Sequence, residues 1–151
     1  MADHTIAIVD EHPLFRDALR QSLKSALGSL DTRVAGSLDE LNTLLNEDDG
    51  IDLILLDLNM PGVQGFSGLL YLRAQYPHLP VAIVSASEDP ATIRRAIDFG
   101  ASGFVPKSQP VEQIRGAVQA VLAGDIWTPP DIDISVVSTS ADEGVIARLA
   151  K

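Results

Sequence analysis

The chain has 151 residues, of which 46% are hydrophobic and 5% aromatic, so we expect one domain whose core is built from Leu, Ile, Val and Ala. Its formal net charge of −10 repels phosphate backbones and argues against nucleic-acid binding by this chain alone. The absence of cysteine excludes disulfides, thiolate metal sites and cysteine nucleophiles.

Targeting signals are also missing from the sequence. The chain enters its first apolar run without a basic region or a signal-length hydrophobic stretch. No segment approaches the roughly 20 apolar residues that a membrane span needs. We therefore expect a soluble, cytoplasmic protein.

Short apolar runs alternate with amphipathic stretches through most of the chain. The runs predict strands at 5–9, 32–35, 51–57, 81–84 and 102–105. Between and after them, helices are predicted from Pro13, from Ser37, near 66–75, from Asp89-Pro90 to Gly100, and from Pro110 to about Ala123. Five strand–helix units in strict alternation imply right-handed crossovers and a parallel sheet.

Local signals support the first two helices. Pro13 suits a first helical turn, and the apolar residues behind it recur at helical spacing: Leu14, Ala18, Leu19, Leu23, Ala26 and Leu27. Ser37 and Glu40 form a capping-box pattern at the start of the second helix, whose apolar side is Leu41, Leu44 and Leu45.

The pattern changes after Gly124. Thr128-Pro129-Pro130 interrupts regular structure, and residues 131–140 show no helical period. We expect residues 125–151 to be a linker, anchored by Trp127, with a short tail helix at 141–150. The predicted domain is therefore 1–124.

Polar residues gather where the predicted strands end. Asp10 and Glu11 close the first strand and Asp57 the third, Ser85 closes the fourth, and Lys107 follows the fifth. In a parallel sheet these ends share one edge, where open α/β sheets place their chemistry. Three carboxylates there require a hard divalent cation such as Mg²⁺.

A carboxylate beside such an ion can attack phosphorus and form an acyl phosphate. The ammonium of Lys107 would neutralise charge on the phosphoryl oxygens, and the Ser85 hydroxyl could hydrogen-bond one of them. Each residue alone also has an ordinary structural explanation. Asp57 could be a solvated loop residue, Asp10-Glu11 could favour the positive end of a helix, and Lys107 could be a surface lysine.

The combined motifs resemble a known family. Over residues 4–123, Val9-Asp10-Glu11-His12-Pro13-Leu14, Leu56-Asp57-Leu58-Asn59-Met60-Pro61-Gly62, Ser85-Ala86 and Gly103-Phe104-Val105-Pro106-Lys107 resemble a response-regulator receiver domain of bacterial two-component systems. The order of motifs is most similar to the NarL/LuxR-type subfamily, which carries a helix-turn-helix output. The implied fold is a doubly wound, flavodoxin-like α/β sheet with strand order 2-1-3-4-5 and helices on both faces.

The resemblance also implies roles for single residues. Asp57 would be the phosphoacceptor; Asp10, Glu11, Asp57 and the Asn59 carbonyl would hold Mg²⁺; Ser85, Ala86 and Lys107 would adjoin the phosphoryl group; and Phe104 would be an aromatic switch that swings inward on phosphorylation. The implied partners are a sensor histidine kinase, the protein's own output domain and a second copy on phosphorylation. Such a domain is a phosphoacceptor that assists its own phosphotransfer and dephosphorylation, rather than an enzyme.

Some positions depart from the family pattern. Glu11 stands where many members have aspartate, and Gln64 stands in a loop where an acid is frequent. Many members have proline after the lysine, joined by a cis peptide, whereas Ser108 follows Lys107. Because a cis bond to a non-proline residue costs about 2.5–4 kcal/mol, the sequence leaves this peptide's geometry open.

Three other functions remain open. A haloacid-dehalogenase-type phosphatase also uses a strand-end aspartate, but its second acid would stand where this chain has Asn59. A degenerate receiver would bind partners without phosphorylation. A flavin-binding flavodoxin would need a Ser/Thr-rich loop after the first strand. We expect no metal role for His4, His12 or His78, which lack metal-ligand spacing, and we interpret Gly100-Ala101-Ser102-Gly103 as a helix stop.

Overall fold

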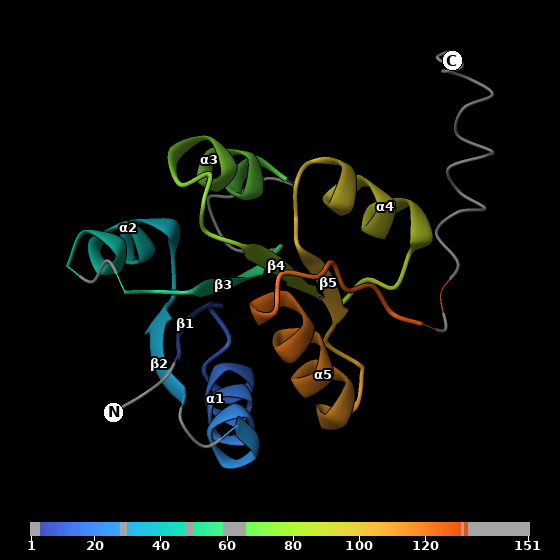
Figure 1. The fold of residues 1–151 in the computed structure, drawn as a ribbon, viewed down its shortest axis with the longest axis horizontal. Coiled ribbons are helices and arrows are strands. Elements are labelled where there is room, and N and C mark those ends of the chain that lie inside the picture. Colours follow the sequence, from blue (N-terminus) through green and yellow to red (C-terminus); the bar gives the residue numbers. More distant parts are fainter. Residues whose placement is uncertain (1–3, 28–29, 48–49, 59–65, 131, 133–151) are drawn as a thin grey trace.

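A five-stranded parallel sheet forms the centre of the protein, in the order β2-β1-β3-β4-β5. The computed structural model describes residues 4–27, 30–47, 50–58, 66–130 and 132. Its elements are β1 (His4–Val9), α1 (Pro13–Leu27), β2 (Leu30–Ala35), α2 (Leu38–Glu47), β3 (Leu53–Asp57), α3 (Ser67–Gln75), β4 (Val81–Ser85), α4 (Pro90–Asp98), β5 (Gly103–Pro106) and α5 (Val111–Leu122). The predicted alternation and flavodoxin-like strand order are confirmed (Figure 1).

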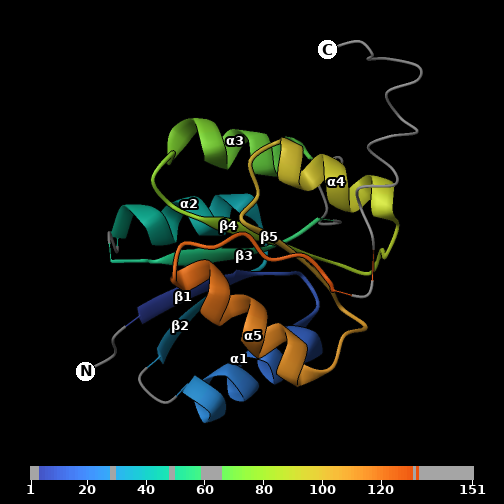
Figure 2. The ribbon, with the colours of Figure 1, turned by 45° about the vertical axis from the view of Figure 1, so that its right-hand side comes forward.

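Helices cover both faces of the sheet. Helices α2, α3 and α4 lie on one face, and α1 and α5 lie on the other (Figure 2). Every residue of β3 is buried, which explains why its sequence is apolar up to Asp57. A strand buried on both faces cannot alternate polar and apolar residues, so its one charged residue stands at its end.

Caps at the helix starts follow the sequence signals. The Ser37 hydroxyl accepts a hydrogen bond from the Glu40 N–H at 3.1 Å. The Glu40 carboxylate reaches back to the Gly36 N–H at 2.7 Å, one residue before the partner expected in a capping box. At α4 the Asp89 carboxylate accepts from the Ala91 N–H at 3.2 Å, with Pro90 in the first helical turn.

Helix α1 buries a narrower face than its apolar pattern predicts. Leu19 and Leu23 are buried and Phe15 is half-buried, which is one stripe at four-residue spacing. Leu14 is 86% exposed and Ala18 is also exposed, so the prediction that they share this face is wrong. Both positions turn away from the stripe around the helix. The side chains of Ala26 and Leu27 lie outside the described residues.

The segment after α5 lies along the outer edge of the sheet. The Trp127 N–H donates to the Ser102 carbonyl at 3.0 Å, and the Phe104 N–H donates to the Trp127 carbonyl at 3.1 Å. The half-buried Trp127 side chain packs on the α1/α5 side, while Ile132 packs on the α2–α4 side. Trp127 therefore anchors this segment as predicted. The predicted tail helix at 141–150 lies outside the described residues.

Among the described helices, none has the length and apolar character needed to cross a membrane. The described peptide bonds are all trans, including that between Lys107 and Ser108.

Candidate functional site

Asp57 is the last residue of the central strand β3 and is only 2% exposed. The next residue, Leu58, continues the sheet contact, because its N–H donates to the Val84 carbonyl of β4 at 3.1 Å. The backbone on both sides of the carboxylate is thereby fixed. Asp57 projects from the carboxyl edge of the sheet, where the sequence places it.

Asp10 directly follows β1 and is equally buried, at 2% exposure. Its N–H donates to the Ala35 carbonyl of β2 at 3.0 Å, and its own carbonyl accepts from the Arg16 guanidinium at 3.1 Å. These bonds hold Asp10 between β2 and α1. Two buried carboxylates therefore face one edge of the sheet from neighbouring strands.

Lys107 supplies the positive charge that these two carboxylates require. Its Nζ lies 2.9 Å from Asp10 Oδ2 and 3.6 Å from Asp57 Oδ2. Its N–H donates to the Ser85 carbonyl at 2.7 Å, which fixes the chain just beyond β5. The ammonium also lies 4.8 Å from the centre of the Phe15 ring, a cation–π contact. The ammonium therefore offsets part of the negative charge of the two aspartates.

His12, for which the sequence predicted no metal role, also lies at this edge. Its Nδ1 lies 2.9 Å from Asp10 Oδ1, 3.9 Å from Asp57 Oδ2 and 3.3 Å from Lys107 Nζ. The backbone N–H of His12 donates to the same Asp10 oxygen at 2.8 Å, so the turn itself brings the ring to the edge. The sequence signal for this position is a histidine two residues after a strand-end aspartate, which spacing among histidines alone does not show.

The other predicted site residues take varied positions. Glu11 is exposed and lies outside the group formed by Asp10, His12 and Asp57. Ser85 is fully buried, and its hydroxyl oxygen accepts from the Ser87 N–H at 3.1 Å. Ala86 is exposed at the start of the following loop. Asn59 lies outside the described residues, as does Gln64. The site therefore unites Asp10, Asp57, Lys107 and His12, with Ser85 behind them.

Phe104 lies inside the core instead of near the surface. Its side chain is 0% exposed and belongs to the cluster that packs between the sheet and α2–α4. The ring is therefore in the inward position in this structure. Its role as an aromatic switch that moves on phosphorylation stays a prediction.

The donor atoms at this edge fit a divalent cation. Asp10, His12 and Asp57 each offer one ligand atom, and these atoms all lie within 4.8 Å of one another. Asp10 Oδ2 is buried and makes no hydrogen bond, although the Lys107 ammonium is near it. Carboxylate oxygens and a residual negative charge are what a hard cation such as Mg²⁺ requires.

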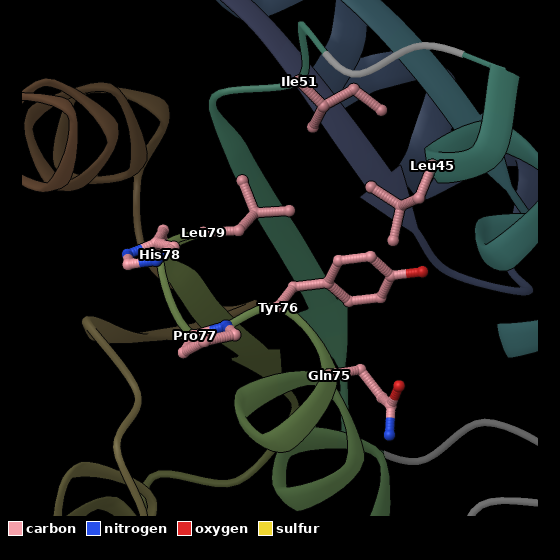
Figure 3. Close-up of a pocket in the computed structure, with 7 residues that line it drawn as sticks. All are labelled: Leu45, Ile51, Gln75, Tyr76, Pro77, His78 and Leu79. Atoms are coloured by element: carbon pink, nitrogen blue, oxygen red, sulfur yellow. The ribbon is translucent and has the colours of Figure 1, made fainter.

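A cavity of about 360 Å³ lies at the opposite edge of the sheet. It is lined by Leu45, Ile51, Gln75, Tyr76, Pro77, His78 and Leu79, just before the strands that end in Asp57 and Ser85 (Figure 3). The Tyr76 ring points toward Leu45, and the lining has neither a carboxylate nor a lysine. This cavity is therefore separate from the group of charged side chains around Asp57.

Comparison with known proteins agrees with this geometry. The family described as response regulator receiver domain matches residues 6–119. The glycerol metabolism activator of Pseudomonas putida is 42% identical over 129 residues, which cover 85% of this chain and 58% of that protein. The nitrate/nitrite response regulator protein NarP of Escherichia coli is 36% identical over 119 residues, which cover 79% of this chain and 55% of that protein.

Solved structures show the same fold. A LuxR family DNA-binding response regulator from Silicibacter pomeroyi aligns with a TM-score of 0.75 and 31% identity, covering 85% of this chain and 99% of the other. A LuxR family two-component response regulator from an Aurantimonas species aligns with a TM-score of 0.79 and 27% identity, covering 91% of this chain and 97% of the other. The chain spans less than two thirds of the length of the two curated relatives.

Proposed function

The chain belongs to the response regulator receiver domain family, with relatives of the LuxR/NarL type, and we propose that it is a signalling switch in which Asp57 accepts a phosphoryl group in the presence of Mg²⁺. One observation carries this proposal: Lys107 Nζ lies 2.9 Å and 3.6 Å from the buried carboxylates of Asp10 and Asp57. A cation held against two buried acids is arranged to receive the oxygens of an incoming phosphoryl group.

The transfer forms a bond between phosphorus and an Asp57 oxygen while the bond from phosphorus to the donor breaks. Lys107 neutralises negative charge on the phosphoryl oxygens, since its ammonium already lies beside the acceptor carboxylate. The Ser85 hydroxyl, whose oxygen accepts from the Ser87 N–H, keeps its hydrogen available for a phosphoryl oxygen. Mg²⁺, when bound, would neutralise charge shared by the carboxylates and the phosphoryl group.

Asp10 and Asp57 support a cation site in this proposal, because both are buried and their ligand atoms belong to one group. Glu11 and the Asn59 carbonyl remain proposed ligands. Glu11 is exposed in the turn beside Asp10. Its side chain is longer than that of aspartate, which gives it a longer reach toward the cation.

We further propose that a sensor histidine kinase donates the phosphoryl group and that the output is transcriptional. The support is that two relatives at 42% and 36% identity are described as an activator and a response regulator. DNA binding would then belong to an output domain. At a net charge of −10, residues 1–151 should not retard duplex DNA, and tight, salt-sensitive retardation would contradict this division of roles.

Incubation with acetyl phosphate and Mg²⁺, followed by intact mass measurement, tests phosphorylation. The wild type should gain one phosphoryl group, while Asp57→Asn and a chelator should each abolish the gain. Asp52→Asn, which changes an exposed carboxylate just before the same strand, is the matched control and should be labelled normally. Full labelling of Asp57→Asn would refute the assignment, and a protein that binds Mg²⁺ but stays unlabelled would be a degenerate receiver.

A further inference from the structure

We propose that His12 is a nitrogen ligand to the divalent cation of this site and that it shifts the site's preference from Mg²⁺ toward borderline transition ions such as Co²⁺. This inference rests on the proposed cation site beside Asp57. The observation behind it is that Asp10, His12 and Asp57 form one group of potential ligands, whereas Glu11 lies outside that group.

The distances suit a shared ion. A metal with ligands at about 2.1 Å places neighbouring ligand atoms about 3.0 Å apart in an octahedron and about 3.4 Å apart in a tetrahedron. His12 Nδ1 is 2.9 Å from Asp10 Oδ1 and 3.9 Å from Asp57 Oδ2. The first separation already matches an octahedral edge. The second must close by about 0.9 Å to reach the same octahedral edge, by rotation of the half-exposed ring.

The turn after β1 holds the imidazole at this position. The His12 N–H donates to Asp10 Oδ1, and Pro13 starts α1 immediately afterwards. The side chain is 58% exposed, so an ion can approach from solvent, while Asp10 and Asp57 beneath it are buried. His12 therefore lies at the mouth of the site, between solvent and the two carboxylates.

The chemistry of the three ligands gives the preference. Mg²⁺ takes oxygen ligands and water and gains little from imidazole, whereas imidazole suits zinc, copper, iron and nickel. For a given nitrogen- and oxygen-containing site, affinity rises from Mn²⁺ through Co²⁺ to Cu²⁺. A nitrogen ligand added to two carboxylates thus raises Co²⁺ affinity while leaving Mg²⁺ affinity nearly unchanged.

The surroundings of the ring distinguish His12 from a simple surface histidine. Lys107 Nζ lies 3.3 Å from His12 Nδ1, so this nitrogen faces the site, and a bound cation would replace the ammonium as its partner. Asp10 Oδ2 is buried without a hydrogen bond, so the acid next to the imidazole retains ligand capacity. Among the described residues, the ion-pair partner of His4 is the exposed Asp52, at 3.8 Å.

Calorimetric titration with Co²⁺ and with Mg²⁺ separately tests the proposal, using the full chain. His12→Asn should weaken Co²⁺ binding by about tenfold or more and change Mg²⁺ binding by less than about twofold. His78→Asn, which removes an exposed histidine at the opposite edge, should change neither affinity. Loss of a nitrogen ligand should also alter the visible absorption of bound Co²⁺.

Other outcomes overturn the inference. Equal Co²⁺ affinity in wild type and His12→Asn would show that the imidazole is no ligand. Tighter binding of both ions by the variant would show that the ring merely occupies the cation's place. His12→Gln serves as a second variant if His12→Asn does not fold, judged by circular dichroism. Failure of acetyl phosphate labelling in the wild type would instead count against the phosphorylation proposal, because the ion titrations measure cation binding and not phosphoryl transfer.

Discussion

Replacing Asp57 with asparagine should make the protein more stable in the absence of divalent cations, although it removes the phosphoacceptor. Asp57 and Asp10 are both buried beside Lys107, so repulsion between their carboxylates destabilises the wild-type site. The amide of asparagine keeps the shape of the side chain and removes that repulsion.

The magnitude follows from the distances. Asp57 lies 3.6 Å from the Lys107 ammonium, an attraction of about 4.6 kcal/mol at an effective dielectric constant of 20. The ligand atoms of Asp10 and Asp57 lie within 4.8 Å, a repulsion of at least about 3.5 kcal/mol on the same scale. These terms nearly cancel, so the several-kcal/mol desolvation penalty of a buried carboxylate decides the sign. We expect Asp57→Asn to raise the free energy of unfolding by about 1–3 kcal/mol.

Urea unfolding with and without Mg²⁺ measures this effect. In chelator, the midpoint should rise in Asp57→Asn with an unchanged slope. Addition of Mg²⁺ at 100 times its dissociation constant should stabilise the wild type by about 2.7 kcal/mol and the variant much less. Asp125→Asn, at an exposed position, is the control and should stay near wild type. A less stable Asp57→Asn protein in chelator would refute the reasoning.

Three further predictions concern stability and titration. Gly100 has φ +106° and lies against the Arg73 side chain, so Gly100→Ala should lower the free energy of unfolding by about 1–3 kcal/mol in the same urea assay. Gly116 in α5 has open space around it, so Gly116→Ala should raise the free energy of unfolding by about 0.5–1 kcal/mol. Asp89→Ala removes the α4 cap and should lower the free energy of unfolding in urea by about 1 kcal/mol. An unchanged free energy of unfolding would contradict a stabilising role of this cap. The Arg33 guanidinium, through its hydrogen bond to Asp31, holds the pKa of that carboxyl below its ordinary value of 3.8. The pair therefore stabilises the folded state at pH above 3.8, and this contribution is lost as the pH falls through the lower pKa of the folded state. In Arg33→Ala an NMR titration should show the pKa of Asp31 rising toward 3.8, and an unchanged pKa would contradict the pairing.

The sheet and the acidic edge could be predicted from sequence because local patterns determine both. A strand buried on both faces must be apolar, so the run from Leu53 to Asp57 shows both the central strand and its functional end. Helix starts were equally visible, since the caps at Ser37 and Asp89 are local hydrogen bonds.

Features that depend on neighbours distant in sequence could not be predicted. The contact of His12 with Lys107 joins residues 95 positions apart, and only the folded sheet edge brings them together. The inward position of Phe104 depends on packing against helices from elsewhere in the chain. Trp127 pairs with Gly103 of β5 and so covers the edge strand of the sheet. The sequence around Trp127 contains prolines and carries no strand pattern that would predict this pairing.

Borohydride reduction of the acetyl phosphate-treated protein tests most directly whether Asp57 is the phosphoacceptor. An aspartyl phosphate is an acyl phosphate, and its reduction leaves homoserine, whereas a phosphorylated serine or threonine is not reduced. Peptide fragmentation should locate homoserine at position 57 in the protein treated with acetyl phosphate and Mg²⁺, and should find none after treatment in chelator. Homoserine at Asp10 or Asp52 instead, or a phosphoryl group that survives reduction, would contradict the account.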